Sequence, residues 1–329
     1  MTMITMAGAL NIALRDAMRE DPNVLVFGED VGTLGGVFRI TDGLTAEFGP
    51  DRCFDTPLAE AGIVGTAVGM AMYGYRPVVE MQFDAFAYPA LEQIISHVAK
   101  MRNRTRGRVG LPMVIRVPFG GGIGSVEHHS ESSEAYYVHT PGLKVVTPGT
   151  VADAYSLLRA AISDPDPVVF FEPKRQYWTK ADVDLQPGSP QDIGRARVLR
   201  AGTTATVVAY GPTVPTALEA AETAHAEEGW QLEVVDLRTL SPLDIETVVD
   251  SVQRTGRAVV VHEAPISGGF GGELAASIQR DCFYYLQAPV MRVTGFDIPY
   301  PPARFEEYYL PSVDRVLEAI AESMAGESR

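Results

Sequence analysis

The chain has 329 residues, 46% of them hydrophobic, and a net charge of −15. This composition is typical of a globular protein with sizeable cores, and the acidic balance disfavours nucleic acid and anionic membrane surfaces as main partners. No apolar run is long enough to span a membrane and no signal peptide is recognisable, so we expect a cytoplasmic protein. Cys53 and Cys282 lie far apart without metal-ligand spacing, which supports neither a disulfide scaffold nor a zinc site.

The first half of the chain alternates strand-like and helical patterns, which is typical of βαβ units around a parallel sheet. Apolar residues at helical spacing predict an N-terminal helix over residues 1–17 that stops before Asp21-Pro22. Further helices are predicted over 61–73, 89–102 and 151–162, and strands over 24–27, 77–82, 113–117, 145–146 and 168–171.

Periodicity fades between residues 173 and 191, where Asp, Pro, Gly and Ser predict a linker. A second βα series follows, with strands predicted over 206–210, 232–237, 258–262 and 290–293, and helices over 214–228, 242–253, 273–285 and 313–324. We therefore expect two α/β domains, residues 1–185 and 186–329. Ligands of such sheets bind beyond the carboxyl ends of strands, which makes 28–30, 82–86, 119–129 and 262–272 the candidate site segments.

Glu60 is the first candidate for chemistry, because it stands where a loop meets a helix rich in small residues. Taken alone, it could be an ordinary first-turn acid favoured by the helix dipole. The loop Gly120–Gly124 could cradle phosphate through backbone N–H groups, but it lacks the Lys-Ser/Thr of a P-loop, and a loop of close backbone approach is favoured. A second run, Gly268–Gly272, is interpreted as tight packing at a helix start.

His128 and His129 follow the first glycine-rich loop. A neutral imidazole there could exchange protons near pH 7. Adjacent residues on an extended segment point in opposite directions, so at most one histidine is expected to face a ligand. The alternative is a loop histidine in a local hydrogen bond. The sequence contains neither Gly-x-Ser-x-Gly nor His-Glu-x-x-His, which argues against an α/β-hydrolase and a zincin.

Several short motifs occur in a characteristic order: Gly28-Glu29-Asp30-Val31, Asp55-Thr56-Pro57-Leu58-Ala59-Glu60, Glu127-His128-His129-Ser130, Pro141-Gly142-Leu143-Lys144-Val145-Val146 and His262-Glu263-Ala264-Pro265. Together they resemble the β subunits of the decarboxylating components of 2-oxo acid dehydrogenase complexes. The segment Phe171-Glu172-Pro173-Lys174 is more similar to the branched-chain enzymes than to the pyruvate enzymes. The resemblance covers nearly the whole chain. It implies a pyrimidine-binding thiamine-diphosphate domain followed by a transketolase-type C-terminal domain.

The resemblance also implies a divided active site. The family motif that holds Mg²⁺ and the diphosphate begins with Gly-Asp-Gly, which this sequence lacks, so a separate α subunit is expected to supply that half. Glu60 is implied to bind N1′ of the aminopyrimidine, which favours the tautomer that removes the C2 proton of the cofactor. His129 is implied to lie near the 2-oxo acid or the acyl-transfer intermediate.

Other cofactor positions follow from the same resemblance. Phe86 is implied to lie against the aminopyrimidine ring, with Leu58 and Gln82 lining the same pocket; core packing is the alternative for all three. Glu29 matches an acid assigned to a proton path between active sites, or else is a buried structural carboxylate. Pro89 stands where some pyruvate-type relatives carry Glu, which leaves such a path incomplete.

Branched-chain relatives also bind K⁺ in this subunit, largely through backbone carbonyls, and oxygen ligands suit such a hard cation. The positions that match this loop pair are Leu111, Met113, Val114, Ala161, Asp164 and Asp166.

The implied reaction is oxidative decarboxylation of a branched-chain 2-oxo acid, followed by acyl transfer to a lipoyl group of the dihydrolipoyl acyltransferase core. The implied assembly is an α₂β₂ heterotetramer. The alternatives are a pyruvate or acetoin dehydrogenase β subunit, a non-catalytic scaffold subunit, and a self-sufficient transketolase-like enzyme.

Overall fold

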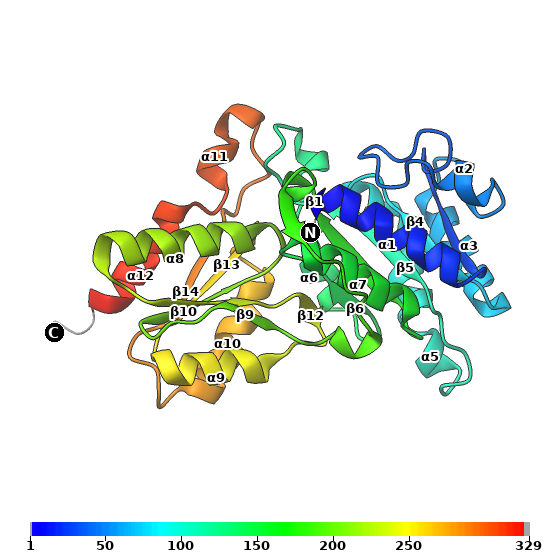
Figure 1. Cartoon of the computed structure of the whole chain (residues 1–329). Coiled ribbons are helices and arrows are strands. Elements are labelled where there is room, and N and C mark those ends of the chain that lie inside the picture. Colours follow the sequence, from blue (N-terminus) through cyan, green and yellow to red (C-terminus); the bar gives the residue numbers. More distant parts are fainter. Residues whose placement is uncertain (1, 326–329) are drawn as a thin grey trace.

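The computed structural model describes residues 2–325 as two α/β domains side by side, with the N-terminal domain on the right of Figure 1. A seven-stranded sheet forms the centre of the N-terminal domain, in the order β12-β6-β7-β5-β4-β2-β3. Its strands are β2 (Val24–Gly28), β3 (Cys53–Asp55), β4 (Arg76–Glu80), β5 (Val114–Phe119), β6 (Lys144–Val146), β7 (Val168–Pro173) and β12 (Thr239–Ser241). All pairs are parallel except β12 with β6.

Helices cover this sheet and its edges. They are α1 (Met6–Glu20), α2 (Leu44–Phe48), α3 (Glu60–Tyr73), α4 (Leu91–Gln93), α5 (Met101–Arg104), α6 (Glu134–Val138) and α7 (Val151–Ser163), with shorter turns η1 (Ala85–Ala90), η2 (Ile94–Val98), η3 (Glu127–His129) and η4 (Lys174–Gln176). Thr5 and Thr150 cap α1 and α7, each accepting a hydrogen bond from a first-turn backbone N–H. These two helices pack against each other on one face of the sheet.

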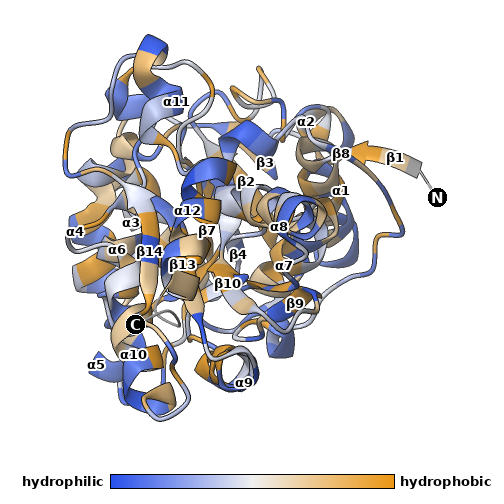
Figure 2. Ribbon diagram, turned by 90° about the vertical axis from the view of Figure 1, so that its left-hand side faces the viewer, coloured by the Kyte–Doolittle hydropathy of each residue, from blue (hydrophilic) through white to orange (hydrophobic). Residues whose placement is uncertain are grey.

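The C-terminal domain has a five-stranded sheet in the order β14-β13-β10-β11-β9, parallel except for β9. Its elements are β9 (Arg197–Arg200), β10 (Ala205–Ala209), η6 (Gly211–Thr213), α8 (Val214–Glu228), β11 (Leu232–Asp236), α9 (Ile245–Thr255), β13 (Ala258–Pro265), α10 (Phe270–Cys282), β14 (Met291–Gly295), η7 (Ala303–Phe305), α11 (Glu306–Tyr309) and α12 (Val313–Met324). In Figure 2, α9 has an apolar side and a hydrophilic side, and its buried residues include Val248 and Val252.

Arg116 lies in the middle of the larger sheet and is fully buried between two carboxylates. Its guanidinium donates to Glu80 at 2.6 Å and to Glu172 at 2.7 and 3.0 Å, so the three central strands β4, β5 and β7 share one ionic network. Tyr177 Oη also donates to Glu172, at 2.7 Å. A buried charge of this kind needs such pairing, because an unpaired one would cost several kcal/mol.

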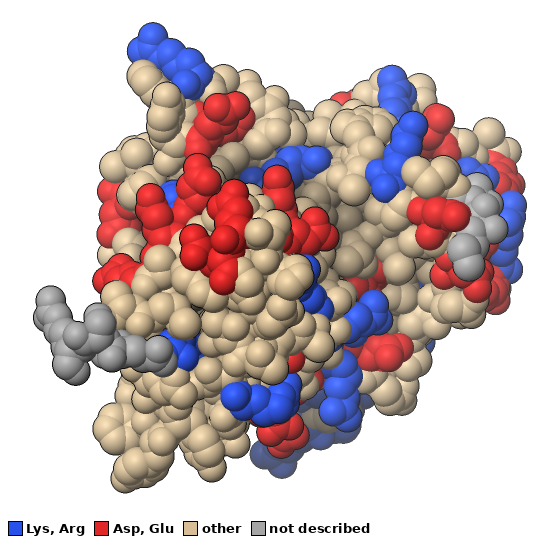
Figure 3. Space-filling view, turned by 60° about the vertical axis from the view of Figure 1, so that its left-hand side comes forward, with Lys and Arg blue, Asp and Glu red and all other residues tan. Residues whose placement is uncertain are grey.

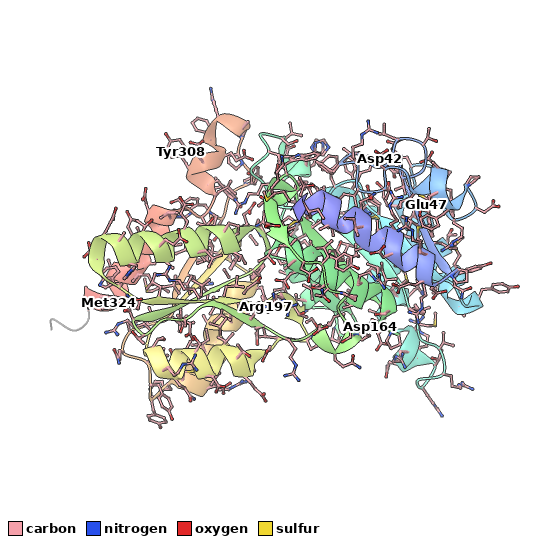
Figure 4. The ribbon with its side chains drawn as sticks, in the orientation of Figure 1. Asp42, Glu47, Asp164, Arg197, Tyr308 and Met324 are labelled. Carbon is pink, nitrogen blue, oxygen red and sulfur yellow. The ribbon has the colours of Figure 1, made fainter. Side chains whose placement is uncertain are left out.

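Polar contacts join the two domains. Asp153, on α7, accepts hydrogen bonds from Arg238 at 3.0 Å and forms an ion pair with Arg197 at 3.1 Å; Figure 4 labels Arg197 between the domains. Tyr210 Oη donates to Glu134 at 2.7 Å across the same boundary. Since β12 also extends the N-terminal sheet, the domains share backbone as well as side-chain contacts.

Most predicted elements are present, but β3, β9 and β12 were not predicted, and three other segments differ from the prediction. The N-terminal helix begins at Met6, because residues 2–5 form β1 (Thr2–Thr5), which pairs antiparallel with β8 (Lys180–Val183); residue 1 lies outside the described residues. The predicted linker therefore contains β8, and also the short turn η5 (Pro190–Asp192). The segment 89–102 is broken into η1, α4, η2 and α5, with Pro89 inside η1 and a π-helical turn at η2.

Two further expectations from composition concern the cysteines and the membrane. Cys53 and Cys282 are free thiols, and both are buried. Among the helices of residues 2–325, none combines the length and the apolar character needed to cross a membrane.

Candidate active site

The candidate site lies at the carboxyl ends of the parallel strands in the N-terminal domain. Glu29 follows β2 directly, Gln82 follows β4, and the glycine-rich loop follows β5. The amide of Gln82 donates to Asp30 Oδ2 at 2.9 Å, which ties the ends of β2 and β4 together. Asp30 has a left-handed backbone, with φ of 57°, so this hydrogen bond fixes a strained turn.

Glu60 is the first residue of α3 and is 8% exposed. The charge of Glu60 acts on Glu29, whose pKa is raised by burial first, then by Glu60, then by Asp30. The carboxyl group of Glu29 is therefore close enough to the start of α3 for the charge of Glu60 to act on it. Glu29 Oε1 and Thr56 Oγ1 are buried and accept or donate no hydrogen bond within residues 2–325. Such unpaired polar atoms suit a nitrogen heterocycle that donates and accepts hydrogen bonds.

A cavity of about 350 Å³ adjoins the start of α3. Its lining includes Thr56, Pro57, Ala59 and Gly62. Leu58, from the same loop, has a side chain that is 78% exposed, which is unusual for leucine and leaves an apolar surface open beside Glu60. Glu29, Glu60 and Phe86 do not line this cavity, so the fit of this end of the domain to the aminopyrimidine of thiamine diphosphate rests on the buried carboxyl groups and on the open apolar surface of Leu58.

An aromatic cluster brings the other predicted residues together. The ring of Phe86 lies 5.4 Å from that of His129 and 6.0 Å from that of His128, measured between centroids. Phe83 stacks on His129 at 4.0 Å. Phe86 belongs to η1, which packs against α3, the helix that Glu60 begins. The structure thus places Glu60, Phe86 and His129 in neighbouring elements.

The expectation that the two histidines point in opposite directions was wrong. Residues 127–129 form the 3₁₀ turn η3 instead of an extended segment, and the two imidazole centroids are only 4.4 Å apart. His129 Nδ1 pairs with Ser125 Oγ at 3.1 Å, whereas His128 is half exposed beside Glu127. The orientation of His129 is therefore fixed through one ring nitrogen, which leaves Nε2 for a ligand.

The surroundings of His129 favour its neutral form. Burial lowers the pKa of His129, and the neighbouring His128 and the ammonium of Lys174 lower it further. A neutral imidazole near pH 7 can accept a proton or donate a hydrogen bond without a change of charge.

Lys174 and Asp84 were missed as site residues, although Lys174 lies in the motif that indicated branched-chain relatives. Lys174 is 1% exposed, and its Nζ lies 6.0 Å from the ring centroid of Phe83. Burial lowers the pKa of Lys174 to about 8, and burial raises that of Asp84 to about 7. Ser133 donates to both carboxylate oxygens of Asp84, at 3.0 and 2.5 Å. Asp84 follows Phe83 in the sequence, whereas only tertiary packing brings Lys174 to the ring of Phe83.

The loop pair expected to bind K⁺ lies at the far end of the domain, where Figure 4 labels Asp164. Lys144 Nζ contacts both carboxylate oxygens of Asp164 at 2.7 Å, and Asp166 pairs with Arg102. Arg76 donates to the backbone oxygens of Ile162 at 3.0 Å and Asp164 at 3.3 Å.

The carbonyls of three other expected ligands, Leu111, Met113 and Ala161, each accept a backbone hydrogen bond. Lys144 and Arg76 neutralise the carboxylate and the backbone oxygen of Asp164, and these fixed positive charges oppose a further cation beside them. We therefore expect no K⁺ at this loop. Within residues 2–325, no group of three or more His, Cys, Asp or Glu side chains is arranged to hold a metal ion.

Comparison with known proteins agrees with this geometry. Residues 2–179 match the transketolase pyrimidine-binding domain, and residues 194–316 match the transketolase C-terminal domain. A solved structure titled "Split gene transketolase, inactive beta4 tetramer" superposes with a TM-score of 0.80 and 25% identity, over 98% of this chain and 99% of that one. The fold and site define a transketolase-type protein of the thiamine-diphosphate class.

Relatives that match nearly the whole chain identify its family within this class of proteins. The chain is 57% identical to the 3-methyl-2-oxobutanoate dehydrogenase subunit beta of Mycobacterium tuberculosis, over 96% of this chain and 91% of the relative. It is 55% identical to the pyruvate dehydrogenase E1 component subunit beta of Leifsonia xyli, over 98% and 95%, and 44% identical to the 2-oxoisovalerate dehydrogenase subunit beta of Pseudomonas aeruginosa, over 96% and 93%. The chain belongs to the family of 2-oxo acid dehydrogenase β subunits.

Proposed function

We propose that this chain, together with an α subunit, catalyses the oxidative decarboxylation of branched-chain 2-oxo acids and transfers the acyl group to the lipoyl group of an acyltransferase core. The observation that carries this proposal is the buried Glu60 at the start of α3, whose charge acts on Glu29 and whose helix packs against η1, the element of Phe86. Phe86 in turn contacts His129. The complex is proposed to work in the cytoplasm.

Glu60 is proposed to hydrogen-bond N1′ of the aminopyrimidine, with Phe86 against the ring and Leu58 at its edge. Gln82 supports this pocket through its hydrogen bond to Asp30. Thiamine diphosphate, when bound, supplies the carbon nucleophile and the electron sink of decarboxylation. The diphosphate and Mg²⁺ are assigned to the α subunit, since this chain has no Gly-Asp-Gly motif.

His129 is proposed to contact the carboxylate of the 2-oxo acid, or the intermediate during acyl transfer. Its Nδ1 is engaged by Ser125, so Nε2 is the atom that would face the substrate. Glu29 is proposed to exchange protons with the site, because its raised pKa brings its titration closer to neutral pH. A short path through residue 89 is absent, since that residue is proline.

The proposed assembly is an α₂β₂ heterotetramer bound to the acyltransferase core. Figure 3 shows acidic side chains gathered on one face of the C-terminal domain. The helices α8 and α12, which pack together, carry the exposed acids Glu219, Glu222, Asp314, Glu318 and Glu322. This face suits a basic binding module on the acyltransferase.

The substrate is tested with the purified αβ complex, assayed with 3-methyl-2-oxobutanoate, pyruvate and acetoin in parallel. The proposal predicts the highest kcat/KM for 3-methyl-2-oxobutanoate. A preference for pyruvate, which the relative from Leifsonia xyli is named for, would overturn the branched-chain assignment. The chain alone with thiamine diphosphate and Mg²⁺ is predicted to be inactive. Activity without the α subunit would favour a self-sufficient enzyme.

A scaffold function is tested on the same complex. Glu60→Ala with intact assembly is predicted to abolish turnover, whereas unchanged turnover would support a non-catalytic subunit.

A further inference from the structure

The backbone N–H groups of the glycine-rich loop bind carboxylate groups of the C-terminal domain. Gly121 N–H donates to Glu263. Gly122 N–H donates to Glu306 Oε1 at 2.7 Å, and Gly124 N–H donates to Glu306 Oε2 at 3.0 Å. Successive backbone N–H groups that converge in this way form an anion-binding concavity. The N–H groups that could have cradled a phosphate are therefore already paired with carboxylates of the C-terminal domain.

The loop approaches Tyr300 so closely that this contact requires glycine. A Cβ on Gly121 would lie 1.8 Å from Tyr300 Oη, and Gly122 has φ of +85°, which other residues rarely adopt. Tyr300 Oη also donates to Glu306 Oε1, at 2.6 Å. The loop, Tyr300 and Glu306 thus form one packed and hydrogen-bonded contact between the domains.

The anchored loop leads directly to His129. Its base is closed by a hydrogen bond from Gly120 N–H to the Glu131 carbonyl, at 2.7 Å. Gly124, which Glu306 holds, is followed by Ser125, and Ser125 Oγ pairs with His129 Nδ1. One short chain of contacts therefore runs from Glu306 through the backbone of Gly124 and the side chain of Ser125 to the imidazole.

Glu306 is the first residue of α11, which stands beside the loop in Figure 1. It is 8% exposed, whereas the next residue, Glu307, is exposed. In Figure 4 the labelled Tyr308 projects outward from the same helix. The element that anchors the loop thus lies in the other domain. Its exposed Glu307, next to the buried Glu306, provides a matched control.

We propose that Glu306 is a positioning residue for the active-site histidine: its carboxylate fastens the glycine-rich loop, and the loop holds Ser125 where it orients His129. The proposal rests on the proposed role of His129 in catalysis. A carboxylate is needed because each of its two oxygens accepts one loop N–H. A glutamine has one oxygen and one NH₂ group, so Glu306→Gln would set an N–H against another donor.

The test uses the αβ complex with Glu306→Gln, Ser125→Ala, the double variant, and Glu307→Gln as the control. Hydrogen exchange of the amides in residues 120–131 is expected to rise about tenfold or more in Glu306→Gln, because hydrogen bonds to a charged acceptor are lost. Exchange in Glu307→Gln is expected to match the wild type.

Turnover separates a positioning role from a structural one. We expect kcat/KM to fall about tenfold in Glu306→Gln and in Ser125→Ala, with no further fall in the double variant, because residues on one chain of contacts are not additive. Thiamine diphosphate affinity is expected to stay at the wild-type value.

Additive losses, or faster exchange with unchanged kcat/KM, would overturn the proposal. Unchanged hydrogen exchange in Glu306→Gln would show that Glu306 does not anchor the loop. A wild-type complex that turns over no 2-oxo acid would instead reject the proposed function, while the exchange measurement would still report the anchor.

Discussion

The imidazole of His129 lies against the ring of Phe83, with 4.0 Å between the ring centroids and 29° between the planes. Phe83 also makes an edge contact with Phe86 at 5.6 Å, and the ammonium of Lys174 lies 6.0 Å from the centroid of its ring. This ring therefore joins the residue proposed to contact the cofactor, the residue proposed to contact the substrate, and a buried cation.

Phe83→Leu is predicted to lower kcat/KM of the αβ complex up to about tenfold, because a stacked aromatic pair contributes about 0.5–1.5 kcal/mol beyond its buried area. Steady-state kinetics with 3-methyl-2-oxobutanoate measure the effect. Phe283→Leu, at a phenylalanine that is 59% exposed, is the control and should behave as wild type. Equal kinetics in the two variants would show that Phe83 does not support His129.

Lys174→Met is predicted to raise the pKa of His129. The positive charge of Lys174 opposes protonation of the imidazole, so its removal makes protonation easier. The acid limb of the pH profile of kcat/KM should then move to higher pH, whereas Lys180→Met, at an exposed lysine, should leave it in place. A shift to lower pH, or none, would contradict the electrostatic link between Lys174 and His129.

His262 is predicted to make the protein less stable in mild acid. Burial, followed by the charge of Arg292, lowers the pKa of His262 to about 4. The unfolded chain takes up this proton below about pH 6.5, so the stabilising effect is complete above that pH and is lost as the pH falls towards 4. Between pH 7 and pH 5 the loss due to this residue is about 2 kcal/mol.

Urea unfolding at the two pH values tests this prediction. His262→Phe should lose about 2 kcal/mol less than wild type on acidification, and His225→Gln, at an exposed histidine, should lose as much as wild type. An unchanged pH dependence in His262→Phe would show that another group titrates.

Stability is predicted to be the same in K⁺ and in Na⁺. Lys144 and Arg76 already neutralise the oxygens of the Asp164 loop, so the thermal midpoint of wild type should agree in the two salts within about 1 °C. In the double variant Arg76→Thr with Lys144→Met, the freed oxygens should make K⁺ the more stabilising ion. A specific stabilisation of wild type by K⁺ would contradict this expectation.

Sequence patterns predicted the fold well where one period extended over a whole element. Strands such as β2 and β10 are apolar runs, and α7 and α12 lie within one or two residues of their predicted bounds. The pattern failed where pairing partners are distant: nothing local shows that residues 2–5 pair with β8. It also failed across Pro89, where helical spacing continued through a segment that the structure divides into short turns.

For the site, resemblance supplied Glu60, Phe86 and His129, which the structure brings into neighbouring elements. Phe83, Lys174, Asp84 and Glu306 could not be predicted. They act through contacts between segments that lie about 50 to 180 residues apart, such as Glu306 with Gly124, at a separation of 182. No spacing rule in the sequence records such a contact.

The central claim is that Glu60 acts on the aminopyrimidine of thiamine diphosphate. Its most direct measurement is deuterium exchange at C2 of the cofactor bound to the αβ complex, comparing wild type with Glu60→Gln. We predict that exchange slows by about 10²-fold or more while the variant still binds the cofactor and the α subunit. Exchange at the wild-type rate in Glu60→Gln would contradict the account.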